Sequence, residues 1–219
     1  MTDETNRPHV LLVVAHPDHD SAAWTLTRAV ERGLRADARA EVTVHDLTAT
    51  GFDPVFTAAD LAVHRLRGEV PADVAREQRL VESADLVALL FPVYWWSLPA
   101  LAKGWVDRVF SRGWAYENTA TGTGSALDEL HFVGFAGVRA DTYHRRGYRD
   151  ALTLQLQHGI AGYSAIPNSS VELLYGTETS DPAAHRELAT QAGALGADLA
   201  RRAHAALDRK SGRVTGQPM

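Results

Sequence analysis

Cysteine is absent from the 219 residues of this sequence, which excludes a disulfide framework, a thiolate-bound zinc ion and a catalytic cysteine. An excess of positive charge is absent too, because 22 Lys and Arg residues face 27 Asp and Glu residues, for a net charge of −5. A general nucleic-acid binder, or a protein that binds membranes through a polybasic surface, would need the opposite balance. The composition therefore predicts no nucleic-acid partner.

Long apolar runs are also absent. The first run, Val10–Ala15, is too short for the hydrophobic core of a signal peptide, and no run approaches the roughly 20 apolar residues of a membrane span. The sequence therefore predicts a cytoplasmic protein without an integral membrane segment. With 45% hydrophobic residues it can bury a sizeable core, and its length fits a single domain over residues 1–219 with a loose tail over Lys210–Met219.

Five short segments are predicted to be β-strands. Val10–Ala15 and Leu86–Phe91 are continuous apolar runs, which are typical of strands buried on both faces of a parallel sheet. Glu41–Asp46 is short and β-branched, as expected for a strand near the edge of a sheet. Leu130–Gly137 and Ser170–Tyr175 complete the set.

Helices are predicted between these strands. Apolar residues recur at helical spacing after Asp20-Ser21, either of which can cap the helix. Further helices are predicted over Leu98–Phe110, Tyr148–Gly159 and Pro182–Arg209. The alternation predicts an α/β fold, with a doubly wound five-stranded parallel sheet and helices on both faces. In such folds the ligand binds at the carboxyl ends of the strands.

The segment His16–Ser21, HPDHDS, joins the first predicted strand to the first helix. Its backbone N–H groups and the helix dipole can hold a phosphate, with His16 and Ser21 as added donors. The dinucleotide fingerprint GxGxxG and the P-loop pattern are both missing. Two alternatives remain open. The loop resembles the AHPDD signature of zinc-dependent sugar-amide deacetylases, where a His and an Asp bind zinc, or it only caps the helix.

A run of three aromatic residues follows the strand at Leu86–Phe91. Tyr94, Trp95 and Trp96 are costly at the exit of a buried strand unless a planar or apolar partner covers them. Core packing is the alternative for any one of them. Adjacent side chains cannot all face one core, however, so the run indicates a stacked ligand or an interface.

The stretch Phe91–Phe110, FPVYWWSLPALAKGWVDRVF, followed by Gly113–Tyr116, resembles the signature region of the NAD(P)H:quinone oxidoreductase family. This flavodoxin-like group includes DT-diaphorase and the ancillary reductase subunits of potassium-efflux systems. The resemblance covers most of the chain and implies strand order 2-1-3-4-5 and a tightly bound FAD or FMN. It also implies NADH or NADPH as donor and hydride reduction of quinone-like or other electron-poor aromatic acceptors in a ping-pong scheme.

The same resemblance implies roles for individual residues. The residues expected to contact the flavin are His16, Ser21, Ala22, Ala23, Gln78, Pro92, Val93, Tyr94, Trp95, Trp96 and Gly137. The substrate pocket is expected to comprise Trp95, Trp114 and Tyr116, the last supplied by the neighbouring subunit of a homodimer. Tyr143 and Arg149 are the expected catalytic residues, and no metal is expected. Arg149 stands where the family has a histidine, and Ala136-Gly137-Val138 replaces its Thr-Gly-Gly loop.

Two other functions remain as alternatives. A flavin-binding regulatory subunit of a transporter would keep the same flavin site, so the sequence does not separate it from an enzyme. A zinc deacetylase would need a further ligand histidine downstream, and it gives no reason for the aromatic run. If the protein is the flavin-dependent oxidoreductase, its expected partners are a small-molecule electron acceptor and a second copy of the chain.

Overall fold

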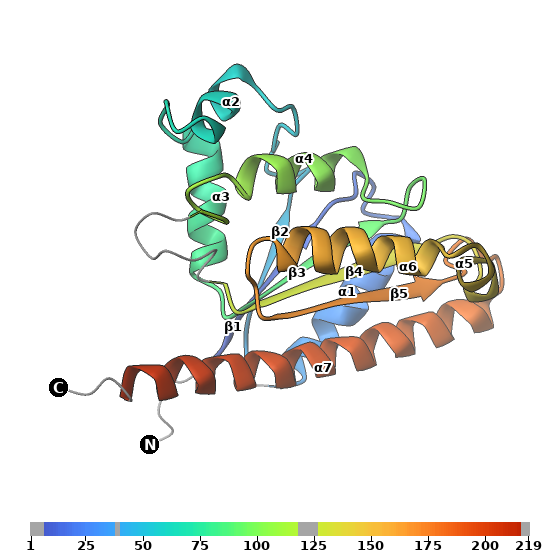
Figure 1. Cartoon of the computed structure of the whole chain (residues 1–219). Coiled ribbons are helices and arrows are strands. Elements are labelled where there is room, and N and C mark those ends of the chain that lie inside the picture. The colour runs from blue at the N-terminus through green and yellow to red at the C-terminus, as the bar shows by residue number, and fades with distance from the viewer. Residues whose placement is uncertain (1–6, 38–39, 118–126, 216–219) are drawn as a thin grey trace.

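A computed structural model describes residues 7–37, 40–117 and 127–215 of the chain (Figure 1). At its centre is a five-stranded parallel sheet in the order β2-β1-β3-β4-β5, which confirms the predicted fold class and strand order. The strands are β1 (His9–Val14), β2 (Glu41–Asp46), β3 (Leu86–Pro92), β4 (Glu129–Ala136) and β5 (Asn168–Tyr175).

The burial of each strand follows its position in the sheet. All residues of β3 and β4 are buried, and so is β1 after its first residue, whereas the edge strand β2 alternates between buried and more exposed positions. Strands covered by helices on both faces need apolar side chains on both faces, which is why their sequences are continuous apolar runs.

The helices form a layer on each face of the sheet (Figure 1). They are α1 (Ala22–Arg35), α2 (Ala58–His64), α3 (Ala72–Glu82), α4 (Ala100–Val109), α5 (Ala140–Arg146), α6 (Tyr148–Thr153), the π-helix η1 (Leu154–Gly162) and α7 (Pro182–Thr215). Helices α1 and α7 pack on one face and against each other, while α3, α4, α6 and η1 cover the other. The predicted helix over 148–159 is therefore α6 continued into η1.

Glycine allows α1 and α7 to cross closely. A Cβ atom at Gly33 would stand 2.0 Å from the carbonyl oxygen of Gly193, and one at Gly196 would stand 2.1 Å from that of Val30. Both distances are far inside van der Waals contact, so any side chain there would push the helices apart. This crossing fixes where the first turn of α1 lies relative to the sheet.

The expected loose tail over Lys210–Met219 is corrected by the structure, because α7 continues as a helix through Thr215. The Lys210 ammonium donates to the Asp85 carboxylate at 2.9 Å and to the Ala84 carbonyl at 3.2 Å, which holds this end of α7 against the chain before β3. Residues 216–219 lie outside the described residues. Despite the length of α7, no helix in the described part of the chain is long and apolar enough to cross a membrane.

Candidate active site

Four of the segments singled out in the sequence meet at one edge of the sheet. Because the strands are parallel, their carboxyl ends share an edge, and loops that follow different strands come together there. His16–Ser21 follows β1, Val93–Trp96 follow β3, and Gly137 follows β4. Tyr143 comes from α5, directly after that loop. This edge is the candidate active site.

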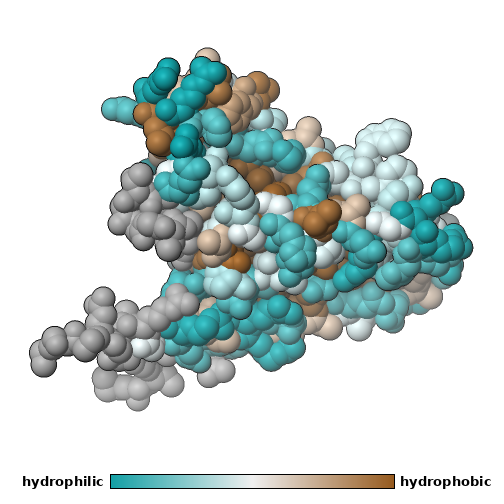
Figure 2. Space-filling view, in the orientation of Figure 1, coloured by the Kyte–Doolittle hydropathy of each residue, from teal (hydrophilic) through white to brown (hydrophobic). Residues whose placement is uncertain are grey.

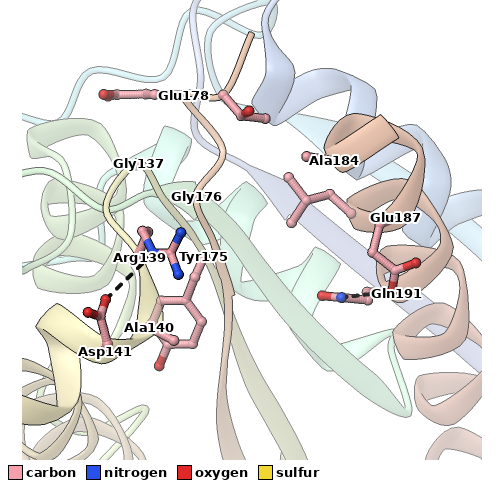
Figure 3. Close-up of a pocket in the computed structure, with 12 residues that line it drawn as sticks. Gly137, Arg139, Ala140, Asp141, Tyr175, Gly176, Glu178, Ala184, Glu187 and Gln191 are labelled. Atoms are coloured by element: carbon pink, nitrogen blue, oxygen red, sulfur yellow. Dashed lines mark hydrogen bonds and ion pairs between the residues drawn. The ribbon is translucent and has the colours of Figure 1, made fainter. Parts of the chain in front are cut away.

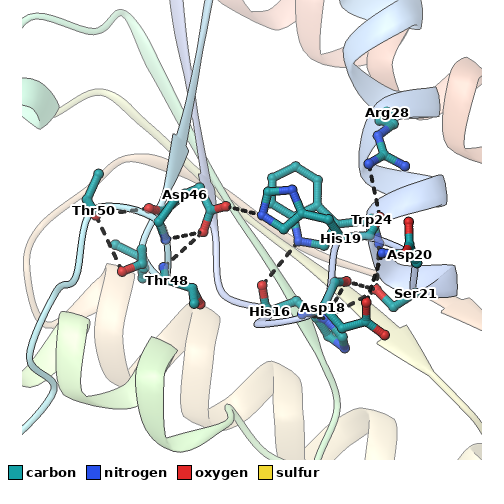
Figure 4. Close-up of polar contacts among 12 residues, drawn as sticks. His16, Asp18, His19, Asp20, Ser21, Trp24, Arg28, Asp46, Thr48 and Thr50 are labelled. Carbon is teal, nitrogen blue, oxygen red and sulfur yellow. Dashed lines mark hydrogen bonds and ion pairs between the residues drawn. The ribbon is translucent and has the colours of Figure 1, made fainter.

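The loop after β1 is arranged as an anion site at the start of α1 (Figure 4). The Ser21 hydroxyl caps α1 by accepting from the Trp24 N–H at 3.2 Å, and it donates to the Asp18 carbonyl at 2.6 Å. The N–H groups of Ala22 and Ala23, in the first turn, have no acceptor among the described residues. Such N–H groups and the positive end of the helix dipole attract a phosphate.

His16 adds a side-chain donor to this loop. Its Nδ1 atom lies 3.1 Å from both the backbone nitrogen and the carbonyl oxygen of Asp18, so the tautomer of the ring decides which of these bonds forms. No hydrogen bond to a described residue uses Nε2. The sequence analysis predicted His16 and Ser21 as two side-chain donors to a phosphate. The structure brings them together, with His16 Nδ1 3.1 Å from Ser21 Oγ.

A second contact anchors the same loop to the end of β2, and the sequence analysis missed it. The His19 Nε2 atom lies 2.6 Å from Oδ2 of Asp46, and the other carboxylate oxygen of Asp46, Oδ1, accepts from the Thr48 N–H at 2.9 Å. The His19 ring stacks on Trp24 with 4.3 Å between centroids. The indole N–H of Trp24 in turn donates to the His16 carbonyl at 3.1 Å (Figure 4). The feature of the sequence that could have indicated this contact is Asp46, a carboxylate at the last position of strand β2.

The aromatic run after β3 forms a strained and exposed turn. Backbone hydrogen bonds between Tyr94 and Ser97, at 3.2 and 3.0 Å, close the turn, and Trp95 and Trp96 between them have φ values of +50° and +55°. Left-handed backbone at non-glycine residues costs free energy and concentrates at functional sites. The Trp95 side chain is 88% exposed and Tyr94 is 51% exposed, so neither belongs to the core.

Trp96 connects this turn to a group of tyrosines. It stacks on Tyr148 with 4.3 Å between centroids, and Tyr143 packs edge-on against both Tyr148, at 5.9 Å, and Tyr175, at 5.1 Å. The Arg149 guanidinium donates to the Tyr175 hydroxyl at 3.2 Å. The two expected catalytic residues, Tyr143 and Arg149, thus both contact Tyr175, which the sequence analysis had not singled out as a site residue.

Tyr143 is buried, and its hydroxyl makes no hydrogen bond to a described residue. Burial, and to a smaller degree the neighbouring Tyr175, raises the pKa of Tyr143 to about 12. The hydroxyl therefore keeps its proton at neutral pH. It is a hydrogen-bond donor held ready at the carboxyl edge of the sheet.

The loop after β4 begins with Gly137, which packs against the side chain of Glu178. A Cβ atom at Gly137 would stand 2.6 Å from the side chain of Glu178, in the loop after β5. Backbone hydrogen bonds join the two loops, from the Gly176 N–H to the Val138 carbonyl and from the Thr177 N–H to the Ala136 carbonyl, each 3.1 Å. Gly137 therefore presents bare backbone at the edge of the sheet.

Three expected site residues are not brought to this edge within one chain. The amide of Gln78 is buried and donates to the Val109 carbonyl and the Ser111 hydroxyl, joining α3 to the end of α4. The Trp114 indole donates to Glu82 at 2.6 Å. Tyr116 packs on Tyr163, at the end of η1. Because α4 runs back from the carboxyl edge of the sheet (Figure 1), the segment after its last residue starts away from that edge.

Among the described residues, no three His, Cys, Asp or Glu side chains come together in a way that could hold a metal ion. In the HPDHDS loop, His16 bonds Asp18 and Ser21, whereas His19 pairs with Asp46 on another strand. The side chains that a zinc deacetylase would direct at one ion thus have separate partners. The geometry gives that alternative no support.

Comparisons with known proteins agree with the fold. A family model described as a flavodoxin-like fold matches residues 8–198. The mouse (Mus musculus) protein named ribosyldihydronicotinamide dehydrogenase (quinone) is 35% identical over 192 residues, which cover 78% of this chain and 83% of that protein. The corresponding protein of the rat (Rattus norvegicus) is 30% identical with the same coverage.

Among solved structures, an NAD(P)H:quinone oxidoreductase from Methanothermobacter marburgensis is similar with a TM-score of 0.80 and 23% identity, covering 88% of this chain and 96% of that one. At 23% identity, this similarity supports the fold alone. The fold, the matched family and the 30–35% identity over most of two quinone dehydrogenases lead to one conclusion. This chain is an oxidoreductase that belongs to the NAD(P)H:quinone oxidoreductase family, within the flavodoxin-like fold.

Proposed function

We propose that the protein uses a bound FAD or FMN to carry a hydride from NADH or NADPH to a quinone-like or other electron-poor aromatic acceptor. One observation carries this proposal. An anion site with unused donors, at the end of β1, lies beside an exposed and strained pair of indoles, at the end of the neighbouring strand β3. A flavin joins a phosphate to a planar ring system and needs both features.

The residues at the edge fit such a group. His16 Nε2 and the N–H groups of Ala22 and Ala23 are available to its phosphate, and Trp95 is available to stack on its ring. When bound, the flavin would supply the hydride chemistry itself. The protein would exclude water, hold the ring and place the protonated hydroxyl of Tyr143 where negative charge develops.

The direct test is the chromophore released when the purified protein is denatured. We expect one flavin per chain, FAD or FMN, and steady-state oxidation of NADH or NADPH with a soluble quinone. A colourless protein that takes up neither flavin would contradict the proposal. A flavin-loaded protein that fails to turn over, yet co-purifies with a membrane transporter, would support the regulatory-subunit alternative.

Tyr143→Phe is expected to slow reduction of the bound flavin about tenfold or more, equivalent to about 1.4 kcal/mol, with little change in flavin affinity. The ring stays in place, and only the donor to the developing charge is lost. Because the pKa of Tyr143 is about 12, its hydroxyl does not titrate near neutrality.

The reductive rate, measured by stopped flow, should therefore lack an inflection between roughly pH 6 and 8, where an active-site histidine would titrate. A clear inflection that survives in Tyr143→Phe, together with an unchanged rate, would assign this role to another residue.

We also propose a homodimer in which Tyr116 enters the partner's site. Large apolar side chains are exposed around α2 and along η1, and Figure 2 shows apolar surface over α2. They are Val55, Phe56, Leu66, Leu154 and Tyr163. Patches of this kind mark interaction surfaces.

Sedimentation at micromolar concentration should give about twice the 23.8 kDa chain mass. Leu154→Glu should weaken the dimer without unfolding the chain, because Leu154 is 67% exposed. A monomer with full reductase activity would rule the proposal out.

A further inference from the structure

Helix α5 and the residues on either side of it carry a concentration of positive charge that the chain as a whole lacks. Residues 139–150 contain four arginines and two aspartates, whereas the full sequence has a net charge of −5. The helix follows the loop after β4, so it lies at the carboxyl edge of the sheet (Figure 1). Figure 2 shows hydrophilic surface over that end of the molecule. The arginine cluster comprises Arg139, Arg145, Arg146 and Arg149.

Acidic side chains neutralise little of this charge. Asp141 is shared between Arg139, at 3.8 Å, and Arg145, at 3.4 Å, and all three side chains are more than half exposed. Figure 3 shows the longer of these two contacts. Arg146 is exposed, and no described residue forms a hydrogen bond or ion pair with its side chain. Because water screens exposed ion pairs, the guanidinium groups keep N–H donors for a ligand.

The cluster borders the aromatic surface of the candidate active site. Arg146 follows Tyr143 by three residues, so the two lie on one face of α5. Tyr143 packs edge-on against Tyr148, at 5.9 Å between centroids, and Tyr148 stacks on Trp96 at 4.3 Å. Arg149 directly follows Tyr148 in the sequence. A row of aromatic rings therefore joins the exposed turn after β3 to the helix that carries the cations.

Cations beside an aromatic surface favour a ligand that is both planar and anionic. The planar part stacks on the rings, and a guanidinium donates to the oxygens of a sulfonate or carboxylate. An uncharged quinone gains only the stacking. The local charge thus distinguishes between acceptors that the aromatic residues alone would treat alike.

We propose that the arginine cluster makes the site selective for aromatic electron acceptors that carry a sulfonate or carboxylate group. This inference rests on the proposed function and specifies its acceptor. The reduction keeps its balance, since a quinone takes a hydride that the donor loses, and a proton from solvent, to give the hydroquinone. The anionic substituent stays unchanged, because it serves recognition only.

Steady-state kinetics of the flavin-loaded protein with two naphthoquinones tests the selectivity. Of the two, 1,4-naphthoquinone-2-sulfonate carries a negative charge and 2-methyl-1,4-naphthoquinone is neutral. Arg146→Gln should lower kcat/KM for the sulfonate about threefold or more and change kcat/KM for the neutral quinone less than about twofold. Each acceptor is compared with itself in the two proteins, so the difference in reduction potential between the acceptors cancels. Arg32→Gln, at an exposed arginine in the last turn of α1, should change neither value.

The phosphates of NADH or NADPH are the competing source of negative charge, and the same kinetics separates them from the acceptor. In a ping-pong scheme kcat/KM for the acceptor does not depend on binding of the donor. Arg146→Gln should therefore leave kcat/KM for the donor within about twofold of the wild-type value. Added salt should lower kcat/KM for the sulfonate more in the wild type than in Arg146→Gln, because salt screens exposed charges.

Quenching of tryptophan fluorescence by the sulfonate measures its binding without turnover. Its Kd should rise about threefold or more in Arg146→Gln and stay unchanged in Arg32→Gln. Equal losses for both quinones, no loss for the sulfonate, or a loss confined to the donor overturns the inference. A protein that takes up no flavin overturns the proposed function alone, since the fluorescence titration of that same protein still tests the arginine cluster.

Discussion

Replacing Arg108 with Met is expected to lower the free energy of unfolding by about 3–5 kcal/mol, as found when one partner of a buried ion pair is removed. Arg108 is only 4% exposed and bonds both Asp60, at 3.1 Å, and Asp73, at 2.7 Å. It also donates to the Asp53 carbonyl at 2.7 Å. Without the guanidinium, the buried Asp60 carboxylate would keep its charge with no cation beside it. Urea unfolding of the two proteins measures the difference.

The exposed pair between Lys103 and Asp107, on the same helix, provides the matched control. Lys103→Met should cost less than about 1 kcal/mol, because solvent screens a surface pair. The double variant Arg108→Met with Asp60→Leu should recover part of the loss, since it removes the stranded charge as well. An Arg108→Met protein as stable as the wild type would show that the cluster contributes no net stability.

The pH dependence of this cluster has a definite sign. Burial alone would raise the pKa values of Asp60 and Asp73, but hydrogen bonds, including those from Arg108, outweigh it and hold both below their usual value of 3.8. A lowered folded-state pKa contributes stability that is complete above the unfolded-state pKa and is lost as the pH falls through the folded-state pKa. Wild-type stability should therefore fall below about pH 4.

In Arg108→Met, Asp60 loses the hydrogen bond and the charge of Arg108, both of which lower its pKa, so the pKa of that carboxyl rises relative to the wild type. Acidification toward pH 4 should then narrow the gap in stability between variant and wild type. Denaturant unfolding at pH 7 and pH 4 measures this change. If the difference in unfolding free energy between variant and wild type is the same at pH 7 and pH 4, Asp60 is not the group that loses its partner in the variant.

The central strands could be predicted because their environment is simple. β1 and β3 are covered on both faces, so burial alone dictates a continuous apolar run. Helix α3 could not be predicted so easily, because it buries polar side chains. The Glu77 carboxylate lies 2.7 Å from His45 Nε2 and accepts from the Trp105 indole at 2.9 Å, and Gln78 is buried beside it. Two buried polar residues interrupt the apolar stripe by which a helix is recognised.

The candidate site likewise has parts that could be predicted from the sequence and parts that could not. The loop His16–Ser21 and the aromatic run Tyr94–Trp96 are each local in sequence, so their residue types and their place after a strand were enough to single them out. The partners that hold them are distant. His19 meets Asp46, Trp96 meets Tyr148, and spacing along one segment carries no sign of such pairs. The prediction of a loose tail from Lys210 was wrong for the same reason, because Lys210 bonds Asp85, which is distant in the sequence.

Trp95→Ala is expected to weaken flavin or acceptor binding by about 1–3 kcal/mol, the range for loss of a stacked aromatic, and to change unfolding stability by less than about 1 kcal/mol. A core tryptophan would behave in the opposite way, with about 3–5 kcal/mol lost from stability. Trp95 is 88% exposed and Trp105 is 1% exposed, so the two residues represent the two cases in one chain.

Trp95→Gly sharpens this test, because the backbone at Trp95 has a φ of +50°, which glycine adopts without a steric penalty. Both variants remove the indole, so both should lose the same affinity for the flavin. Only the glycine variant should also relieve the strained turn, for a gain in stability of up to about 1 kcal/mol. The strained backbone at Trp95 would then lower the stability of the fold while it holds the indole in its exposed position. If both variants bound flavin as tightly as the wild type, Trp95 would not stack on it, and the exposed turn would have to serve the dimer interface instead.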